Sequence, residues 1–379
     1  MFFKRLTFWT VLFSLLLVSC GKGNPTSNGV PPPPTVNPGG DDTEEPGDET
    51  DTPKPWDENR GKVVRPKAGN GWTVTPVSGY QGVTYYAFDG TEPVSKRKQR
   101  IFVTDVDLSK GYSLKLAYYN GNNIASRIFK STGAVAVINA GYEKTAIWCR
   151  VNGTNIGWIQ YDRIGKDNDK PVEANDVPQW KSEAAVYLNQ DQDVRIRFSG
   201  RDKNLAEWRA LYSAKCYTEN NFITSAPMLI SDYEPVGTTF CDLHPRRNSS
   251  SEDPYNHQAS TSNPRTAIAT TEDGHVLFIV VDGRRTVSTG ISALELTTFL
   301  VNNFNPQYAI NLDGGGSSAM CVAGQGDPDT HVVNYPCDNK DASKEIKIGS
   351  ETIVWPKESN GPDHKGERAR DTFFYIVKK

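Results

Sequence analysis

Short runs of β-branched and aromatic residues, bounded by polar turns, recur from about residue 71 to the last residue. Runs of this length and composition predict β-strands. The residues from Thr271 to Gly274 join two such runs and predict a tight hairpin. The expected strands are Ile101–Asp107, Tyr112–Tyr119, Val135–Asn139, Val194–Phe198, Arg265–Thr270, Val276–Asp282, Tyr308–Leu312 and Phe373–Val377.

Apolar residues at helical spacing are rare in the same region. The best helix candidate is Ile291–Asn303, where Leu296, Phe299 and Leu300 share one face. Pro306 disfavours a continuation of this helix. Many strands, few helices and no internal repeat predict an α+β fold. We expect a single domain over residues 61–379, built on a large mixed β-sheet.

The N-terminus has the pattern of an export signal. Lys4 and Arg5 precede an apolar run, Leu6–Val18, and Ser19 then precedes Cys20. This is the lipobox pattern, in which cleavage before the cysteine exposes a thiol that carries lipid. The run of about 13 residues is shorter than the roughly 20 that a spanning helix needs. The sequence predicts a signal peptide over residues 1–19; the alternative is an ordinary signal with a chance cysteine.

Residues 20–60 form a low-complexity segment after this cysteine. The segment holds the prolines Pro31–Pro34 and the acidic stretch Asp41–Asp51. Such a composition buries too little apolar area to fold, so we expect a disordered spacer, or alternatively an interaction tail. The expected location is the cell envelope, periplasmic or surface-exposed, with lipid as the only membrane contact. The net charge of −3 gives no basic surface for nucleic acid, and nothing in the sequence indicates an oligomeric state.

Five cysteines remain after Cys20, and an odd count leaves at least one free thiol. The candidate disulfides are Cys216 with Cys241 and Cys321 with Cys337. No CxxC or HExxH spacing indicates zinc. We therefore expect no required cofactor, although Asp313 and Asp282, described below, could share a divalent cation.

The strongest chemical signal is a strand, Ala309–Leu312, that ends in Asp313 and a run of small residues. Consecutive glycines let main-chain N–H groups converge on an anion such as phosphate, and they let a ligand approach the backbone closely. Asp313 would face that ligand; the alternative is a plain turn. The candidate phosphate-binding residues here are Gly314, Gly315, Gly316, Ser317 and Ser318.

Four other residues at strand or helix ends could contribute chemistry. Arg265 opens a strand after the polar insertion 242–263, which could be a lid or a disordered excursion. Arginine grips phosphate in two bonds; the alternative is a surface arginine at a strand start. Asp282 ends a strand that looks buried, and Asn139 ends another, where it could bind a sugar hydroxyl or cap the turn. Glu295 is a candidate catalytic acid, but Ser292-Ala293-Leu294-Glu295 also fits a helix capping box.

The blocks Arg265–Ile268, Asp282-Gly283, Gly290–Glu295 and Ala309–Ser317 resemble the phosphodiester glycosidase family in order and spacing. Fainter matches are Ile138–Gly141, Asn334–Pro336 and Glu367-Arg368. The resemblance implies carboxylates at Asp313, Asp282 and Glu295. It also implies substrate contacts from Arg265, Asn139, Gly141 and Arg368. The family usually has Asn-Gly-Gly-Phe-Phe where this chain has Asn139-Ala140-Gly141-Tyr142-Glu143, which points to a different sugar.

The resemblance therefore implies a hydrolase that releases a sugar from a sugar-1-phosphodiester in an exported or environmental glycan. Its partner would be that carbohydrate phosphodiester. A phosphate ester departs readily with little protonation, so one carboxylate and a set of phosphate-binding groups could suffice. Two alternatives remain open. One is a non-catalytic glycan-binding lipoprotein, and the other is a phosphodiesterase that breaks the P–O bond.

Overall fold

The computed structural model describes residues 54–144, 147–157, 181, 183–188, 194–199, 219–239, 261–358 and 361–379 of the chain. The expected signal peptide, Cys20 and most of the expected linker lie outside these residues. Cys216, Cys241 and residues 242–260 of the polar insertion also lie outside them. No helix of the described part is long and apolar enough to cross a membrane.

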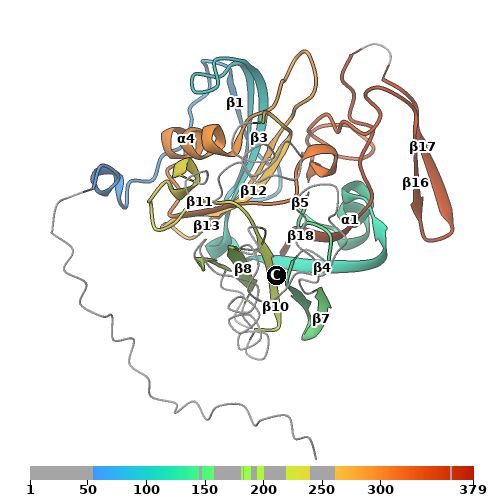
Figure 1. Cartoon of the computed structure of the whole chain (residues 1–379), viewed down its shortest axis with the longest axis horizontal. Helices are drawn as coiled ribbons and strands as arrows, with labels where there is room; N and C mark the ends of the chain where they lie inside the picture. Colours follow the sequence, from blue (N-terminus) through green and yellow to red (C-terminus); the bar gives the residue numbers. More distant parts are fainter. Residues whose placement is uncertain are drawn as a thin grey trace, which may run out of the picture. The chain divides into compact units, whose positions relative to one another are not determined.

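The central element is a seven-stranded sheet (Figure 1). Each of its neighbouring strand pairs is antiparallel. In spatial order its strands are β1 (Trp72–Pro76), β2 (Val83–Thr91), β3 (Lys98–Asp107), β13 (His275–Val281), β12 (Arg265–Thr270), β14 (Tyr308–Asn311) and β11 (Met228–Ile230).

Three further sheets accompany it, and their ladders are antiparallel as well. The five-stranded sheet has the order β7 (Thr154–Gly157), β6 (Cys149–Val151), β10 (Asn221–Ser225), β8 (Ala184–Leu188) and β9 (Val194–Phe198). The four-stranded sheet has the order β15 (Met320–Val322), β5 (Ala136–Asn139), β18 (Arg370–Lys378) and β4 (Tyr112–Asn123). The hairpin of β16 (Lys344–Ile348) and β17 (Glu351–Trp355) forms the fourth sheet.

The described part is therefore mostly β, and the expectation of one large mixed sheet was wrong. It contains two α-helices, α1 (Ala125–Thr132) and α4 (Ala293–Asn303). Strand-forming runs reveal where strands lie but not which way they run or how many sheets they share. That is why the sequence did not separate the sheets.

Apolar clusters cover both faces of the central sheet. On one face, residues such as Ala267 and Ile279 pack with Leu296 and Phe299 of α4. On the other face, residues such as Phe278 belong to the large cluster that includes the four- and five-stranded sheets. This double burial explains why β13 is apolar almost throughout and why β12 is buried along nearly its whole length rather than on alternate residues. Figure 1 shows α4 beside the central sheet, with β4, β5 and β18 on the other side.

Candidate active site

A polar pocket lies at one edge of the central sheet. β12 and β14 are antiparallel, with Ala267 opposite Asn311, so the start of β12 and the end of β14 meet at this edge. The turn after β5 and the residues before β18 complete its wall. The pocket has a volume of about 160 Å³. The described residues that line it are Tyr142, Glu143, Lys181, Asn263, Arg265, Arg284, Asp313, Gly314, Gly315, Gly316 and Arg368.

Hydrogen bonds fix Asp313 beside the turn after β5. The Asp313 N–H donates to the carbonyl of Ala140 at 3.0 Å. The side-chain amide of Asn139 donates to the carbonyl of Asp313 at 2.6 Å. Its oxygen accepts from the Thr266 hydroxyl at 2.9 Å and from the Ala319 N–H at 3.2 Å. Asn139 is buried and is not among the described residues that line the pocket. Through its hydrogen bond it holds the main chain of Asp313 in place.

The three glycines after Asp313 sit too close to other atoms to carry side chains. A Cβ atom at Gly314 would lie 2.7 Å from the Pro264 carbonyl oxygen, and one at Gly316 would overlap the Arg368 guanidinium. Gly315 has a φ of +62°, a conformation that favours glycine. Its N–H donates to the carbonyl of Pro264 at 2.8 Å. Of the three amides expected to bind an anion, that of Gly315 is therefore already engaged within the protein.

The Asp313 carboxyl group is largely buried and forms an ion pair with Arg370 at 2.8 Å. Burial raises its pKa, the charges of Arg370 and Arg368 oppose that rise, and the charge of Glu143 adds to it. A buried carboxyl held between such opposing influences is typical of catalytic sites. Arg370 was not anticipated from the sequence, because it is simply the first residue of β18.

Arg265 is 2% exposed. Its guanidinium donates to the carbonyl of Ile291 at 2.9 Å and to that of Thr261 at 2.9 Å. Burial lowers the pKa of Arg265 to about 10, so the group stays positively charged at neutral pH. Its hydrogen bonds fix the guanidinium in the pocket wall.

Two cationic side chains of the pocket were not among the expected site residues. Arg284 has a φ of +60°, and its guanidinium donates to the Asn263 side-chain oxygen at 3.0 and 3.2 Å. Its place directly after Asp282-Gly283 was the signal that could have identified it. The Lys181 ammonium lies 5.1 Å from the centre of the Tyr142 ring, within range of a cation–π contact. No motif surrounds Lys181 in the sequence.

Arg368 lines the pocket, as the resemblance implied. It forms a forked ion pair with the buried Asp338, with donor–acceptor distances of 2.6, 3.0 and 3.1 Å. The hydrogen bonds to Asp338 raise the pKa of Arg368. This geometry fixes the plane of the Arg368 guanidinium. The Arg368 side chain is 38% exposed.

Asp282 does not reach the pocket. Its carboxyl accepts hydrogen bonds from the Tyr335 N–H at 3.0 and 3.1 Å and from the Asn334 side chain at 3.3 Å. The segment that contains these two residues covers the end of β13. Burial raises the pKa of Asp282 to about 7, against the opposing effect of these hydrogen bonds.

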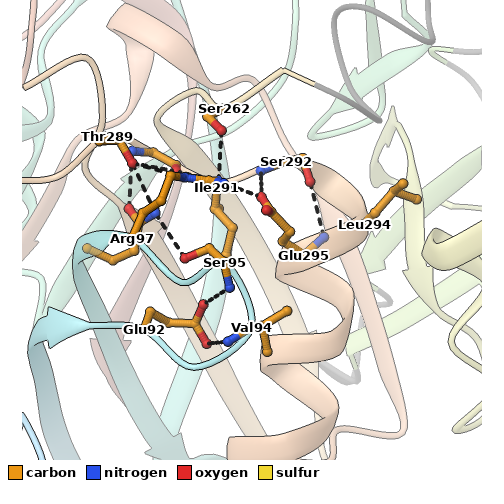
Figure 2. Close-up of polar contacts among 12 residues, drawn as sticks. Glu92, Val94, Ser95, Arg97, Ser262, Thr289, Ile291, Ser292, Leu294 and Glu295 are labelled. Atoms are coloured by element: carbon orange, nitrogen blue, oxygen red, sulfur yellow. Dashed lines mark hydrogen bonds and ion pairs between the residues drawn. The ribbon is translucent and has the colours of Figure 1, made fainter.

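Glu295 also lies outside the described lining of the pocket. The capping-box interpretation is confirmed, because the Ser292 N–H donates to Glu295 at 2.8 Å and the Ser292 hydroxyl accepts from the Glu295 N–H at 3.2 Å. Figure 2 shows the Arg97 guanidinium next to the same carboxylate, at 2.8 Å. Burial works to raise the pKa of Glu295, but the hydrogen bonds from Arg97 and Ser292 outweigh it and lower the pKa.

Three other expected contact residues lie behind the pocket wall. The Ser318 and Thr266 hydroxyls are hydrogen-bonded at 3.1 Å. Ser317 is buried, and its hydroxyl lowers the pKa of the Asp313 carboxyl. A Cβ atom at Gly141 would lie 2.5 Å from Ile223, so the residue is small for packing reasons. None of the three belongs to the described lining of the pocket.

The cysteines correct one expectation. Cys321 and Cys337 are both free thiols, so the predicted pairing between them was wrong. The number of residues between two cysteines does not show whether their sulfur atoms meet in the folded protein. Among the residues that the structure describes, no three His, Cys, Asp or Glu side chains are grouped to hold a metal ion.

Comparison with known proteins agrees with the resemblance seen in the sequence. The family model for phosphodiester glycosidases matches residues 132–355, more than half of the chain. The protein belongs to the phosphodiester glycosidase family. The matched region contains β5, β12, β13, α4 and β14, whereas Arg368 and Arg370 of the pocket lie beyond it.

A curated relative is the SPbeta prophage-derived uncharacterized protein YomE of Bacillus subtilis (strain 168). It is 33% identical over 94 residues, which cover 22% of this chain and only 14% of that protein. A similar solved structure is the catalytic domain of zebrafish N-acetylglucosamine-1-phosphodiester alpha-N-acetylglucosaminidase, auto-inhibited by its pro-peptide. The two sequences are 17% identical. The structural match covers 81% of this chain and 88% of the zebrafish chain, with a TM-score of 0.49. A second similar structure is that of a hypothetical protein from Synechocystis, which is 13% identical. The match covers 82% of this chain and 68% of that chain, with a TM-score of 0.44.

Proposed function

We propose that the protein is a hydrolase that cleaves the glycosidic bond of a sugar-1-phosphodiester in an exported or environmental glycan. Membership of the phosphodiester glycosidase family supports this reaction class. The observation that carries the proposal is the charge pattern of the pocket. A largely buried carboxyl, Asp313, stands among four cationic side chains, which are Lys181, Arg265, Arg284 and Arg368.

The cationic side chains are suited to an anionic phosphodiester. In the proposed complex, Arg265 and Arg284 hold the phosphate oxygens with fixed guanidinium planes. The N–H groups of Gly314 and Gly316, both residues of the pocket lining, would add main-chain donors. Arg368, oriented by Asp338, would contact the same group or the sugar. No cofactor enters this scheme.

Asp313 is assigned to the anomeric carbon. Its carboxylate, held by Arg370, would stabilise the positive charge that develops on the sugar ring when the glycosidic bond breaks. The leaving group is a phosphate ester, which carries its own negative charge and departs without a strong general acid. One buried carboxylate and a set of phosphate-binding cations are therefore sufficient for bond cleavage.

We assign Asp282, Glu295 and Asn139 to positioning rather than to direct contact. Asp282 holds the main chain of Tyr335, and Glu295 caps α4. Asn139 holds the main chain at Asp313. Each of these side chains is hydrogen-bonded to neighbouring residues and lies outside the described lining of the pocket, which leaves the chemistry to that lining.

Sugar release from a panel of aryl phosphodiesters of common hexoses and N-acetylhexosamines tests the proposal. We expect release by the wild-type protein and a loss of at least 10²-fold on Asp313→Asn, the size seen when one electrostatic contact is removed from a transition state. Binding of the panel without release, in folded protein, would contradict the proposal and favour a glycan-binding role.

We also propose that Cys20 carries lipid and that the low-complexity segment between Cys20 and the first described residue, Lys54, holds the domain away from the membrane. The lipobox Leu17-Val18-Ser19-Cys20 supports this. Metabolic labelling with a fatty acid should mark the wild-type protein but not Cys20→Ala. Equal labelling of both would contradict the anchor.

A further inference from the structure

Two carboxyl groups line the pocket among the described residues, and Glu143 is the second. The Asp313 side chain is 15% exposed, whereas Glu143 is exposed to solvent. The two acids therefore occupy one pocket in different environments. Paired acids in unlike environments commonly divide the work of one reaction.

The chain on both sides of Glu143 is held firmly. The preceding residue, Tyr142, donates its hydroxyl to the carbonyl of Ala226 at 3.0 Å and accepts from the Asn311 side chain at 3.2 Å. The following residue, Lys144, packs its main chain against Gly157, where a Cβ atom would lie 2.5 Å from the Lys144 carbonyl oxygen. Glu143 is exposed, but its backbone is fixed between two anchors.

The same turn is also tied to Asp313. The Ala140 carbonyl accepts from the Asp313 N–H at 3.0 Å, and the Gly141 N–H donates to the Thr372 hydroxyl at 3.0 Å. The pKa of Asp313, which is raised mainly by burial, also responds to the charge of Glu143. The two carboxyl groups therefore line one pocket, on a strand end and a turn that are hydrogen-bonded to each other.

Hydrolysis needs a group that Asp313 does not provide. Water is a weak nucleophile, and a positioned base that takes its proton accelerates attack by roughly 10²–10⁴-fold. Asp313 is already paired with Arg370. An exposed carboxylate on the pocket wall meets water directly and can return the proton to solvent.

We propose that Glu143 is the general base that activates the attacking water, an inference that rests on the function proposed above. Glu143 takes one proton from the water, and the water oxygen forms a bond to the anomeric carbon. The bond from that carbon to the phosphate oxygen breaks, and its electron pair leaves with the phosphate monoester. The proton then passes from Glu143 to solvent.

The test compares Glu143→Gln and Glu143→Asp with wild type on the aryl phosphodiester panel. Glu345→Gln, which removes an equally exposed carboxylate on the hairpin of β16 and β17, is the matched control. We expect roughly a 10²–10⁴-fold loss of kcat in Glu143→Gln, partial recovery in Glu143→Asp, and no change in the control.

Sodium azide gives a readout that a structural role would not produce. Azide is an anion and needs no base, so it should restore turnover of Glu143→Gln and yield a glycosyl azide. A wild-type rate in Glu143→Gln would overturn the inference, as would a loss of rate that azide does not restore. Absence of sugar release by wild type would instead refute the proposed function itself, so the two failures are distinct.

Discussion

Replacing Asn139 by alanine tests whether this residue positions Asp313 or contacts the substrate. The side chain makes three hydrogen bonds inside the protein, to the Asp313 carbonyl, the Thr266 hydroxyl and the Ala319 N–H. Thr266 keeps a second partner, Ser318, at 3.1 Å. The substitution therefore leaves two main-chain groups without these partners, the part-buried Asp313 carbonyl and the buried Ala319 N–H.

The expected destabilisation follows from that count. Each unsatisfied buried group costs about 1–3 kcal/mol, so Asn139→Ala should lower the free energy of unfolding by about 2–6 kcal/mol. In a domain of this size, 1 kcal/mol lowers the melting temperature by roughly 2–4 °C. The structure accordingly predicts a drop in Tm of several degrees, measured by calorimetry.

The matched control is Asn120→Ala, which removes the same atoms from an exposed position on β4. It should leave Tm unchanged. In Asn139→Ala, kcat should fall because Asp313 is displaced. A variant with wild-type Tm and kcat but a raised KM would refute this reasoning, because it would show that Asn139 binds substrate and supports no framework.

Three other predictions follow from the same contacts. Gly316→Ala places a methyl group on the Arg368 guanidinium, so we expect a raised KM for the phosphodiester; unchanged kinetics would contradict it. Glu295→Gln weakens a helix cap, so it should cost about 1 kcal/mol of stability in denaturant unfolding with wild-type kcat/KM; a large loss of kcat would restore Glu295 as a catalytic acid. Asp282 has its pKa raised from 3.8 to about 7, so its contribution to stability is present below pH 4 and is lost as the pH rises towards and past 7. The Tm of Asp282→Asn relative to wild type should therefore increase from pH 4 to pH 8, and a constant difference would contradict this.

The sequence located most of the elements that carry the site. The expected strands at β12, β13 and β14 and the helix α4 agree with the structure to within two residues at each end. These segments are recognisable because their burial on one or two faces imposes a clear apolar pattern. The helix α1 was missed, because it is eight residues long with few apolar side chains and depends on packing against neighbouring strands.

The site was predicted only in part. Asp313, Arg265, Arg368 and the three glycines do meet in one pocket. Asp282 was expected there because it ends a strand next to β12, but the sequence does not report that the segment around Tyr335 covers that strand end. Glu143 follows the turn of Asn139 and Gly141, which the sequence did place at the site, whereas only the three-dimensional arrangement brings Lys181 to Asp313.

The central claim is that the glycosidic C–O bond breaks, and hydrolysis in ¹⁸O-labelled water tests it most directly. The wild-type protein is incubated with a sugar-1-phosphodiester that it turns over, and the products are separated and weighed by mass spectrometry. The proposed mechanism places the label in the released sugar and leaves the phosphate monoester unlabelled. Label in the phosphate would show P–O cleavage and would contradict the assignment of Asp313 to the anomeric carbon.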